Sequence, residues 1–189
     1  MANLEWKSKL LSSGLPLEFD AAKILVEKQL AVSYDYSYRR LDDIENKEFS
    51  VDLHADSFFP LDDNLPIQQT VDFLIECKYR TPNKKWIFLP EILDNNNHTF
   101  STPLKLVDEF SKFSFESRLG AFLEYDLCMK GIEISLDSKD AHEVGIKHGS
   151  LQLLYAMPVL LHNKIHFALR DIFDEAYPFY IIPILVTNA

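Results

Sequence analysis

Cysteine is scarce in this sequence, and no long apolar run is present. Cys77 and Cys128 are the two cysteines among 189 residues, and they form no Cys-x-x-Cys pair. That number is too small for a disulfide framework or a structural zinc site, which fits a reducing compartment. The N-terminus has no signal-peptide pattern, and the apolar runs are too short to span a bilayer. We therefore expect a soluble, cytoplasmic protein without a membrane partner.

Basic residues are outnumbered, because 19 Lys and Arg face 29 Asp and Glu and the formal net charge is −10. This balance disfavours a broad electrostatic footprint on nucleic acid, although a local basic groove or a partner protein can supply positive charge. A hydrophobic content of 47% is enough for one core, so we expect a single domain over residues 1–189. The chain stops directly after a strand-like run, which indicates either a fragment of a longer protein or a missing C-terminal element.

The apolar periodicity predicts a helix, three strands, a poorly defined middle, a long helix and a last strand. This order indicates an α/β architecture, in which helices flank a mixed sheet. Residues 81–137 form an insertion of uncertain structure between the third strand and the later helix. The predicted helices cover residues 15–29, 117–130 and 138–161, and Ser138 is the expected N-terminal cap of the third. The predicted strands cover residues 30–39, 48–56, 70–79, 85–89 and 178–186.

The most informative stretch is Phe-Leu-Ile-Glu-Cys-Lys-Tyr-Arg at residues 73–80. Side chains two residues apart in a strand point to the same face, so Glu76 and Lys78 lie together while Cys77 points the other way. An upstream strand carries Asp52 in the alternating run Val-Asp-Leu-His-Ala-Asp. If the two strands pair with their apolar faces aligned, their acidic faces align as well.

In the upstream strand, alternation predicts that Val51, Leu53 and Ala55 share one face and that Asp52, His54 and Asp56 share the other. Carboxylates so close destabilise one another unless a cation or a proton intervenes. Carboxylate oxygens, a backbone carbonyl and waters are the ligands that Mg²⁺ prefers, and Mn²⁺ has similar preferences. Such an ion lowers the pKa of water and neutralises charge on a phosphate, and a nearby lysine would assist the attacking water.

At these residues the chain resembles the PD-(D/E)XK nuclease superfamily, and in particular Mrr-type restriction endonucleases. The resemblance rests on Asp52, on Glu76-Cys77-Lys78 after an apolar strand, and on the upstream Gly-Leu-Pro-Leu-Glu-Phe helix at residues 14–19. It implies a restriction-endonuclease-like fold and Mg²⁺-dependent hydrolysis of phosphodiester bonds in DNA. It also implies catalytic roles for Asp52, Glu76, Lys78 and Glu18, and a metal held by Asp52, Glu76 and Cys77.

The resemblance covers residues 14–80 with its motifs and the rest only through the order of elements. No proline precedes Asp52, and the insertion separates the third strand from the later helix. In that helix, Gln152 and Tyr155 are similar to a glutamine-tyrosine motif of the RecB-like branch, but their spacing differs from that of the family. We expect Gln152 to contact the substrate.

Other polar residues near the motif each have two readings. Glu18 either compensates the helix dipole or faces the metal, and His54 is either a solvated neighbour or a contact to the scissile phosphate. Arg80, Lys84 and Lys85 form the basic cluster next to the motif, and they either bind DNA phosphates or make a polar turn. For Glu76 and Lys78 the alternative is a surface ion pair that adds little to stability.

Two functional hypotheses follow. The first is a Mg²⁺- or Mn²⁺-dependent deoxyribonuclease acting in restriction, defence or repair, alone, as a homodimer or with a partner protein. The second is a non-catalytic module on the same fold that binds protein or nucleic acid. A different Mg²⁺ enzyme acting on small phosphorylated substrates would need a glycine-rich loop for the phosphate, and the five scattered glycines provide none.

Overall fold

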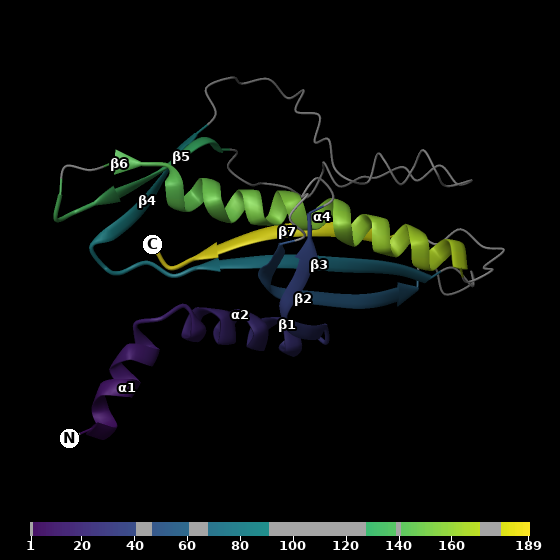
Figure 1. The fold of residues 1–189 in the computed structure, drawn as a ribbon, viewed down its shortest axis with the longest axis horizontal. Helices are drawn as coiled ribbons and strands as arrows, with labels where there is room; N and C mark the ends of the chain where they lie inside the picture. The colour runs from purple at the N-terminus through teal and green to yellow at the C-terminus, as the bar shows by residue number, and fades with distance from the viewer. Residues whose placement is uncertain (1, 41–46, 61–67, 91–127, 139–140, 171–178) are drawn as a thin grey trace.

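The computed structural model describes residues 2–40, 47–60, 68–90, 128–138, 141–170 and 179–189. Their order along the chain begins with two helices and three strands, and the colour in Figure 1 follows it. The elements are α1 (Ala2–Leu11), α2 (Leu15–Glu27), β1 (Ala31–Arg39), β2 (Glu48–Pro60), β3 (Gln68–Lys78), β4 (Lys84–Pro90), β5 (Cys128–Ser135), β6 (Ala141–His142), α4 (Val144–Arg170) and β7 (Phe179–Thr187).

The main sheet has the strand order β1-β2-β3-β7. The pairs β1–β2 and β2–β3 are antiparallel, whereas β7 runs parallel to β3 after the chain has passed through α4. Helix α4 lies along one face of this sheet and α2 lies on the opposite face, as Figure 1 shows. The mixed α/β class predicted from the sequence is therefore confirmed.

A smaller antiparallel sheet of order β4-β5-β6 adjoins the N-terminal end of α4. Two of its strands come from the described part of the predicted insertion. In the part of the chain that the structure covers, no helix is both long and apolar enough to cross a membrane.

The core is divided between the two faces of the main sheet. The cluster under α4 contains Tyr38, Val51, Leu74, Leu153, Ala156, Leu160 and Ile181. The cluster under α2 contains Ala22, Leu53, Ala55, Ile75 and Cys77.

The prediction that Val51, Leu53 and Ala55 share one face is wrong, since Val51 lies under α4 and the other two lie under α2. The ladder between β1 and β2 contains no Asp35–Asp52 pair, and Asp35 has a left-handed φ of 56°. Aspartate tolerates this conformation better than most residues. The alternation of faces therefore reverses at Asp52, which no regular strand pattern would predict.

The predicted elements over residues 15–29, 30–39, 48–56, 70–79, 85–89 and 178–186 are confirmed, with ends shifted by a few residues. The long helix was predicted to begin after Ser138, but β6 intervenes and α4 begins at Val144. The prediction of a helix near 117–130 is wrong over residues 128–130, which begin β5, and residues 117–127 lie outside the described residues. Helix α1 was not predicted.

Candidate functional site

Asp52 lies at the point where β2 stops pairing with β3. The last residue pair between the two strands is Leu53 with Ile75. Just beyond it, Asp52 Oδ2 accepts a hydrogen bond of 2.6 Å from the backbone N–H of Cys77. The N–H and C=O of one strand residue point to the same side, so the carbonyl of Cys77 faces Asp52 as well. This bond brings the Asp52 carboxylate to the strand segment that carries Glu76.

Glu76 is buried with only partial compensation of its charge. Its side chain is 1% exposed, and its Oε1 accepts a hydrogen bond from Lys78 Nζ. Its Oε2 has no hydrogen-bond partner in the described part of the chain. Burial raises the pKa of Glu76, and the negative charge of Asp52 adds to this effect against the bond from Lys78. A buried carboxylate oxygen without a partner is costly, so it favours binding of a cation.

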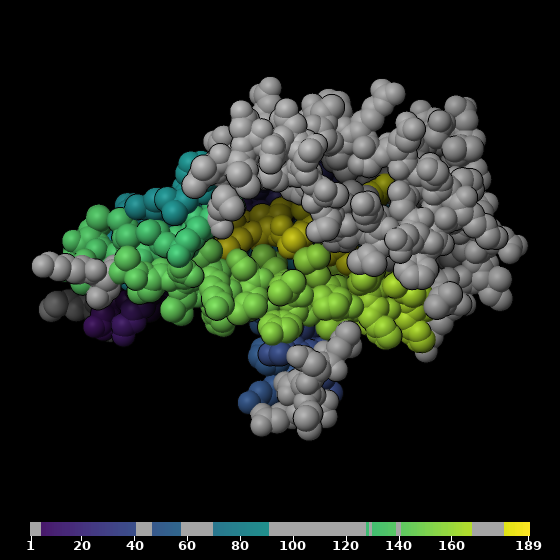
Figure 2. Space-filling view, turned by 90° about the horizontal axis from the view of Figure 1, so that it is seen from above, coloured from purple at the N-terminus to yellow at the C-terminus, as the bar shows by residue number. Residues whose placement is uncertain are grey.

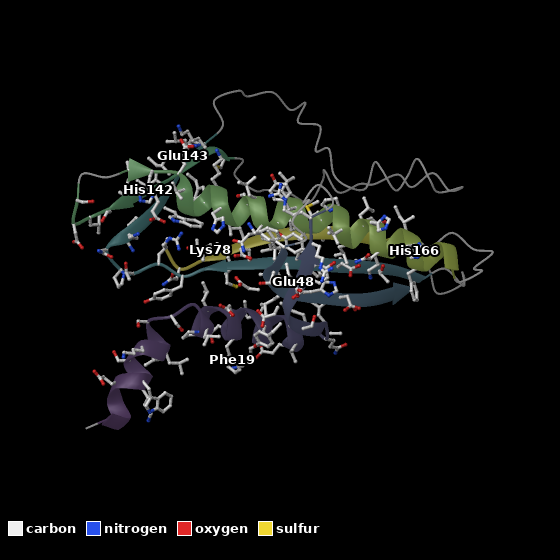
Figure 3. All side chains as sticks on the ribbon, in the orientation of Figure 1. Phe19, Glu48, Lys78, His142, Glu143 and His166 are labelled. Atoms are coloured by element: carbon white, nitrogen blue, oxygen red, sulfur yellow. The ribbon has the colours of Figure 1, made fainter. Side chains whose placement is uncertain are left out.

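Lys78 is hydrogen-bonded to a residue of helix α4. Lys78 Nζ donates a hydrogen bond of 2.9 Å to Gln152 Oε1, while Gln152 Nε2 donates one of 3.2 Å to the carbonyl of Ser50. Tyr38 Oη donates to the backbone carbonyl of Gln152 at 3.1 Å. Figure 3 shows Lys78 near the end of β3, beneath the N-terminal half of α4. The lysine is therefore bonded on two sides, by Glu76 and by Gln152.

Gly149 makes this close approach of helix and lysine possible. A Cβ at this position would lie 2.7 Å from Leu185 Cδ1 and 3.2 Å from Lys78 Cε. Real Cβ atoms do not come as close as the first distance, so a side chain at position 149 would force the Leu185 side chain to move. Sequence reasoning missed Gly149, although a glycine inside a predicted helix is itself a signal of tight packing.

Glu18 and Asp35 add negative charge to the same region. Pro16 and Glu18 both stand in the first turn of α2, and the Glu18 side chain is partly buried. Burial raises the pKa of Glu18, and the negative charges of Asp52 and Asp35 raise it further, whereas the positive charge of Lys78 lowers it. Asp35 was missed because it looked like a polar residue of an alternating strand. Its left-handed backbone has no signal in the sequence.

Asp52 shows the same imbalance of charge. Burial raises its pKa, while the Cys77 N–H and Lys78 act in the opposite direction. Within this cluster one lysine faces the carboxylates of Glu18, Asp52 and Glu76. The described residues therefore compensate the negative charge of these carboxylates incompletely.

The donor atoms at the site fit a hard divalent cation. They are carboxylate oxygens of Asp52 and Glu76 and the carbonyl oxygen of Cys77, which suit Mg²⁺ or Mn²⁺. Among the residues that the structure describes, no three His, Cys, Asp or Glu side chains are arranged to hold a metal together. Waters would complete the coordination, as Mg²⁺ sites usually require.

The Cys77 side chain itself is no ligand. It is 6% exposed and packs in the cluster under α2. Burial raises the pKa of its thiol to about 12, and the charges of Asp52, Glu18 and Glu76 add to this shift. The thiol is therefore protonated at neutral pH, and only the backbone carbonyl of this residue is available to a metal.

His54, which was predicted as a possible contact to the scissile phosphate, has a partner away from Asp52 and Glu76. His54 Nε2 lies 2.8 Å from Oδ1 of the fully buried Asp72, whose Oδ2 is 2.9 Å from Lys164 Nζ of α4. His54 is thus part of an interior polar group and is not directed at Asp52.

Two other residues predicted to contact the substrate are Gln152 and Lys85. Gln152 is hydrogen-bonded to Lys78, so its contact in the structure positions the lysine, and Lys85 is exposed on β4.

Arg80 and Lys84 converge on a different buried carboxylate, Glu133 of β5. Arg80 Nε lies 2.5 Å and Lys84 Nζ 3.2 Å from the oxygens of Glu133. Trp86 Nε1 donates to the same carboxylate at 2.8 Å, and His142 Nε2 lies 3.8 Å away. Burial alone would raise the pKa of Glu133, but the bonds from Trp86, Arg80 and Lys84 lower it to about 2. The two basic residues are therefore paired with a buried carboxylate of the small sheet, and the Lys84 side chain remains 39% exposed.

Comparison of the chain with family models, with curated proteins and with solved structures finds no match in any of the three.

Proposed function

We propose that this chain is a metal-dependent nuclease that hydrolyses phosphodiester bonds in DNA. The observation that carries the proposal is the meeting of Asp52 with the Glu76-Cys77-Lys78 segment where β2 leaves β3. The Oε2 of Glu76 supports it, because that oxygen is buried, has no hydrogen-bond partner among the described residues and can be satisfied by a cation. Asp52, Glu76 and the carbonyl of Cys77 would hold Mg²⁺ or Mn²⁺.

The metal would supply positive charge to the scissile phosphate and lower the pKa of a nearby water. Asp52 and Glu76 would orient their carboxylates toward it, with Asp52 fixed by the Cys77 N–H. Lys78 would hydrogen-bond the attacking water or a phosphate oxygen, and Gln152 would hold the lysine in reach through its 2.9 Å bond. Glu18 would bind waters at the site from the α2 side.

The arrangement of elements also supports the proposal. A four-stranded mixed sheet with α2 on one face and α4 on the other is the architecture that the resemblance to PD-(D/E)XK nucleases implies. We therefore also propose that this sheet and its two helices form a restriction-endonuclease-like fold.

A second candidate function is a non-catalytic binding module on the same fold. One observation favours it, namely that Arg80 and Lys84 are bonded to Glu133 and do not form a free basic surface beside Lys78. Together with the net charge of −10, this favours a protein partner over DNA for such a module.

The direct test is a cleavage assay with supercoiled, linear and single-stranded DNA in the presence of Mg²⁺ or Mn²⁺. We expect cleavage that Lys78→Met lowers by at least about 100-fold, because the lysine acts on the reacting groups. Methionine keeps most of the volume of this largely buried side chain, and circular dichroism checks that the fold persists. Lys23→Ala is the matched control, since Lys23 lies exposed on α2 and its Nζ is 3.9 Å from the exposed Glu27.

Two results would contradict the nuclease proposal. One is a folded wild-type protein that cleaves none of the three DNA forms with either metal, which favours the binding module. The other is a Lys78→Met protein that cleaves as well as the wild type, because the activity would then come from another site or a contaminant.

A further inference from the structure

Two histidines lie one turn apart on the C-terminal half of α4. His162 and His166 are both exposed, and their ring centroids are 6.2 Å apart with the ring planes at 3° to each other. Figure 3 shows His166 near the C-terminal end of the helix. Residues four apart on a helix lie on the same face, which is the spacing at which two histidines bind one metal ion.

The packing of α4 directs these two rings away from the sheet. Lys164 lies between them in the sequence, and its Nζ is 2.9 Å from the buried carboxylate of Asp72 on β3. Leu160 is also turned inward, with 4% exposure. A residue two positions from Lys164 is rotated by about 200° around the helix axis, so both histidines lie on the outer face. Figure 2 shows this helix open to view along its length.

The nitrogens of both rings are available for a ligand. In the part of the chain covered by the structure, the two rings contact each other, and neither has a hydrogen-bond or ion-pair partner. His54 and His142 differ, because they lie 2.8 Å from Asp72 and 3.8 Å from Glu133, respectively. Histidines of α4 that make no contact with a carboxylate keep their nitrogens free for a metal.

We propose that His162 and His166 form a surface site that chelates one Zn²⁺, Cu²⁺ or Ni²⁺ ion. Imidazole nitrogen suits these metals, whereas Mg²⁺ prefers oxygen ligands. The site is therefore distinct in chemistry from the carboxylate site at Asp52 and Glu76, and it does not depend on the proposed nuclease function. Waters complete the coordination, since no third His, Cys, Asp or Glu joins the pair among the described residues.

Binding at this site would stabilise the end of α4. Pro158 lies inside the helix and removes one backbone hydrogen bond, so the turns that follow it depend more on other contacts. A metal bound to both His162 and His166 links two successive turns of the helix. It binds the unfolded chain much more weakly, because the helix no longer holds the two rings together. By linkage, the melting temperature should rise with the concentration of the metal.

The test is a titration of the whole chain with Zn²⁺ and, separately, Cu²⁺, in buffer with Mg²⁺ in excess. Calorimetry gives the affinity, and electron paramagnetic resonance of the Cu²⁺ complex counts the coordinating nitrogens. We expect His162→Ala and His166→Ala each to weaken binding by about tenfold or more, because a single imidazole loses the advantage of chelation. The Cu²⁺ spectrum should change from two nitrogens to one.

The matched control is His148→Ala. His148 is exposed on the same helix, but the positions four residues away are Val144 and Gln152, so it has no histidine partner there. This variant should keep the wild-type affinity. The proposal is overturned if His162→Ala and His166→Ala bind Zn²⁺ and Cu²⁺ as the wild type does, or if His148→Ala weakens binding equally.

Discussion

Glu76 and Glu133 are two buried glutamates whose surroundings differ sharply. Their side chains are 1% and 2% exposed, respectively. Glu133 is surrounded by Arg80, Lys84, Trp86 and His142. Among the residues that the structure describes, Glu76 has a bond from Lys78 on one oxygen and no hydrogen-bond partner on the other. The pKa of Glu133 is lowered to about 2, while that of Glu76 is raised.

Burial acts in the same direction on both carboxyls, so their partners decide the outcome. At Glu133 the positive side chains and the indole N–H outweigh the cost of burial. Glu133 and these partners therefore form a buried ion-pair cluster in which the charge is compensated. At Glu76 the bond from Lys78 does not outweigh the cost of burial, and Asp52 adds further negative charge. A buried carboxylate with incomplete compensation is a candidate ligand, whereas a fully compensated one is a structural link.

The largest change in stability is expected for Glu133→Gln. This substitution leaves Arg80 and Lys84 without their counter-charge inside the small sheet. We expect a loss of about 3 kcal/mol in the free energy of unfolding, measured by urea denaturation. The control is Glu143→Gln, since Glu143 is exposed and pairs with Lys130 at 2.6 Å, and it should leave stability unchanged. Equal effects of the two substitutions would contradict the structural role of Glu133.

The pH dependence of that loss follows from the lowered pKa of Glu133. The stabilisation is complete above the ordinary value of 4.5, and it disappears as the pH falls toward about 2. The difference in unfolding free energy between wild type and Glu133→Gln should therefore be constant from pH 6 to 7 and shrink below pH 4.5. Urea melts at several pH values measure it, and a difference that grows on acidification would contradict the account.

A smaller change of opposite sign is expected for Asp52→Asn. The pKa of Asp52 is raised, so its charged form destabilises the metal-free fold, and the cost appears as the pH rises through the raised pKa. The asparagine oxygen can still accept the bond from the Cys77 N–H. We expect the metal-free protein to gain up to about 1 kcal/mol at pH 7, seen as a higher melting temperature. A clear drop would mean that the charge of Asp52 is itself stabilising.

The smallest change in stability is expected for Gln152→Ala. It removes the bonds to Lys78 Nζ and to the Ser50 carbonyl at a partly exposed position. We expect a loss of about 0.5 kcal/mol in unfolding free energy, but a loss of about tenfold in DNA cleavage because Lys78 is no longer held in place. A variant with full cleavage activity would show that Glu76 alone positions the lysine.

The sequence predicts the parts of this site that depend on local spacing. Glu76 and Lys78 fall on one face of β3 because side chains two residues apart always do, and α2 follows from its proline and its apolar stripe. The same reasoning predicted the strands of the main sheet, since their apolar runs are short and bounded by turns.

The parts that depend on distant contacts were not predictable. The reversal of faces at Asp52 coincides with the left-handed Asp35 at the same level of the neighbouring strand, and neither position has a signal in the local sequence. The engagement of Arg80 and Lys84 requires Glu133, which lies about 50 residues further along the chain and reaches them through β5. Two of the three residues of the basic cluster, Arg80 and Lys84, are therefore paired with a buried carboxylate.

The most direct test of the account is a calorimetric titration of the metal-free protein with Mg²⁺, comparing wild type, Glu76→Gln and the control Glu143→Gln. We expect one Mg²⁺ to bind the wild type and the control, and we expect Glu76→Gln to abolish this binding while the protein stays folded. If the wild type binds no Mg²⁺, or if Glu76→Gln binds it equally well, the difference between Glu76 and Glu133 does not mark a metal site.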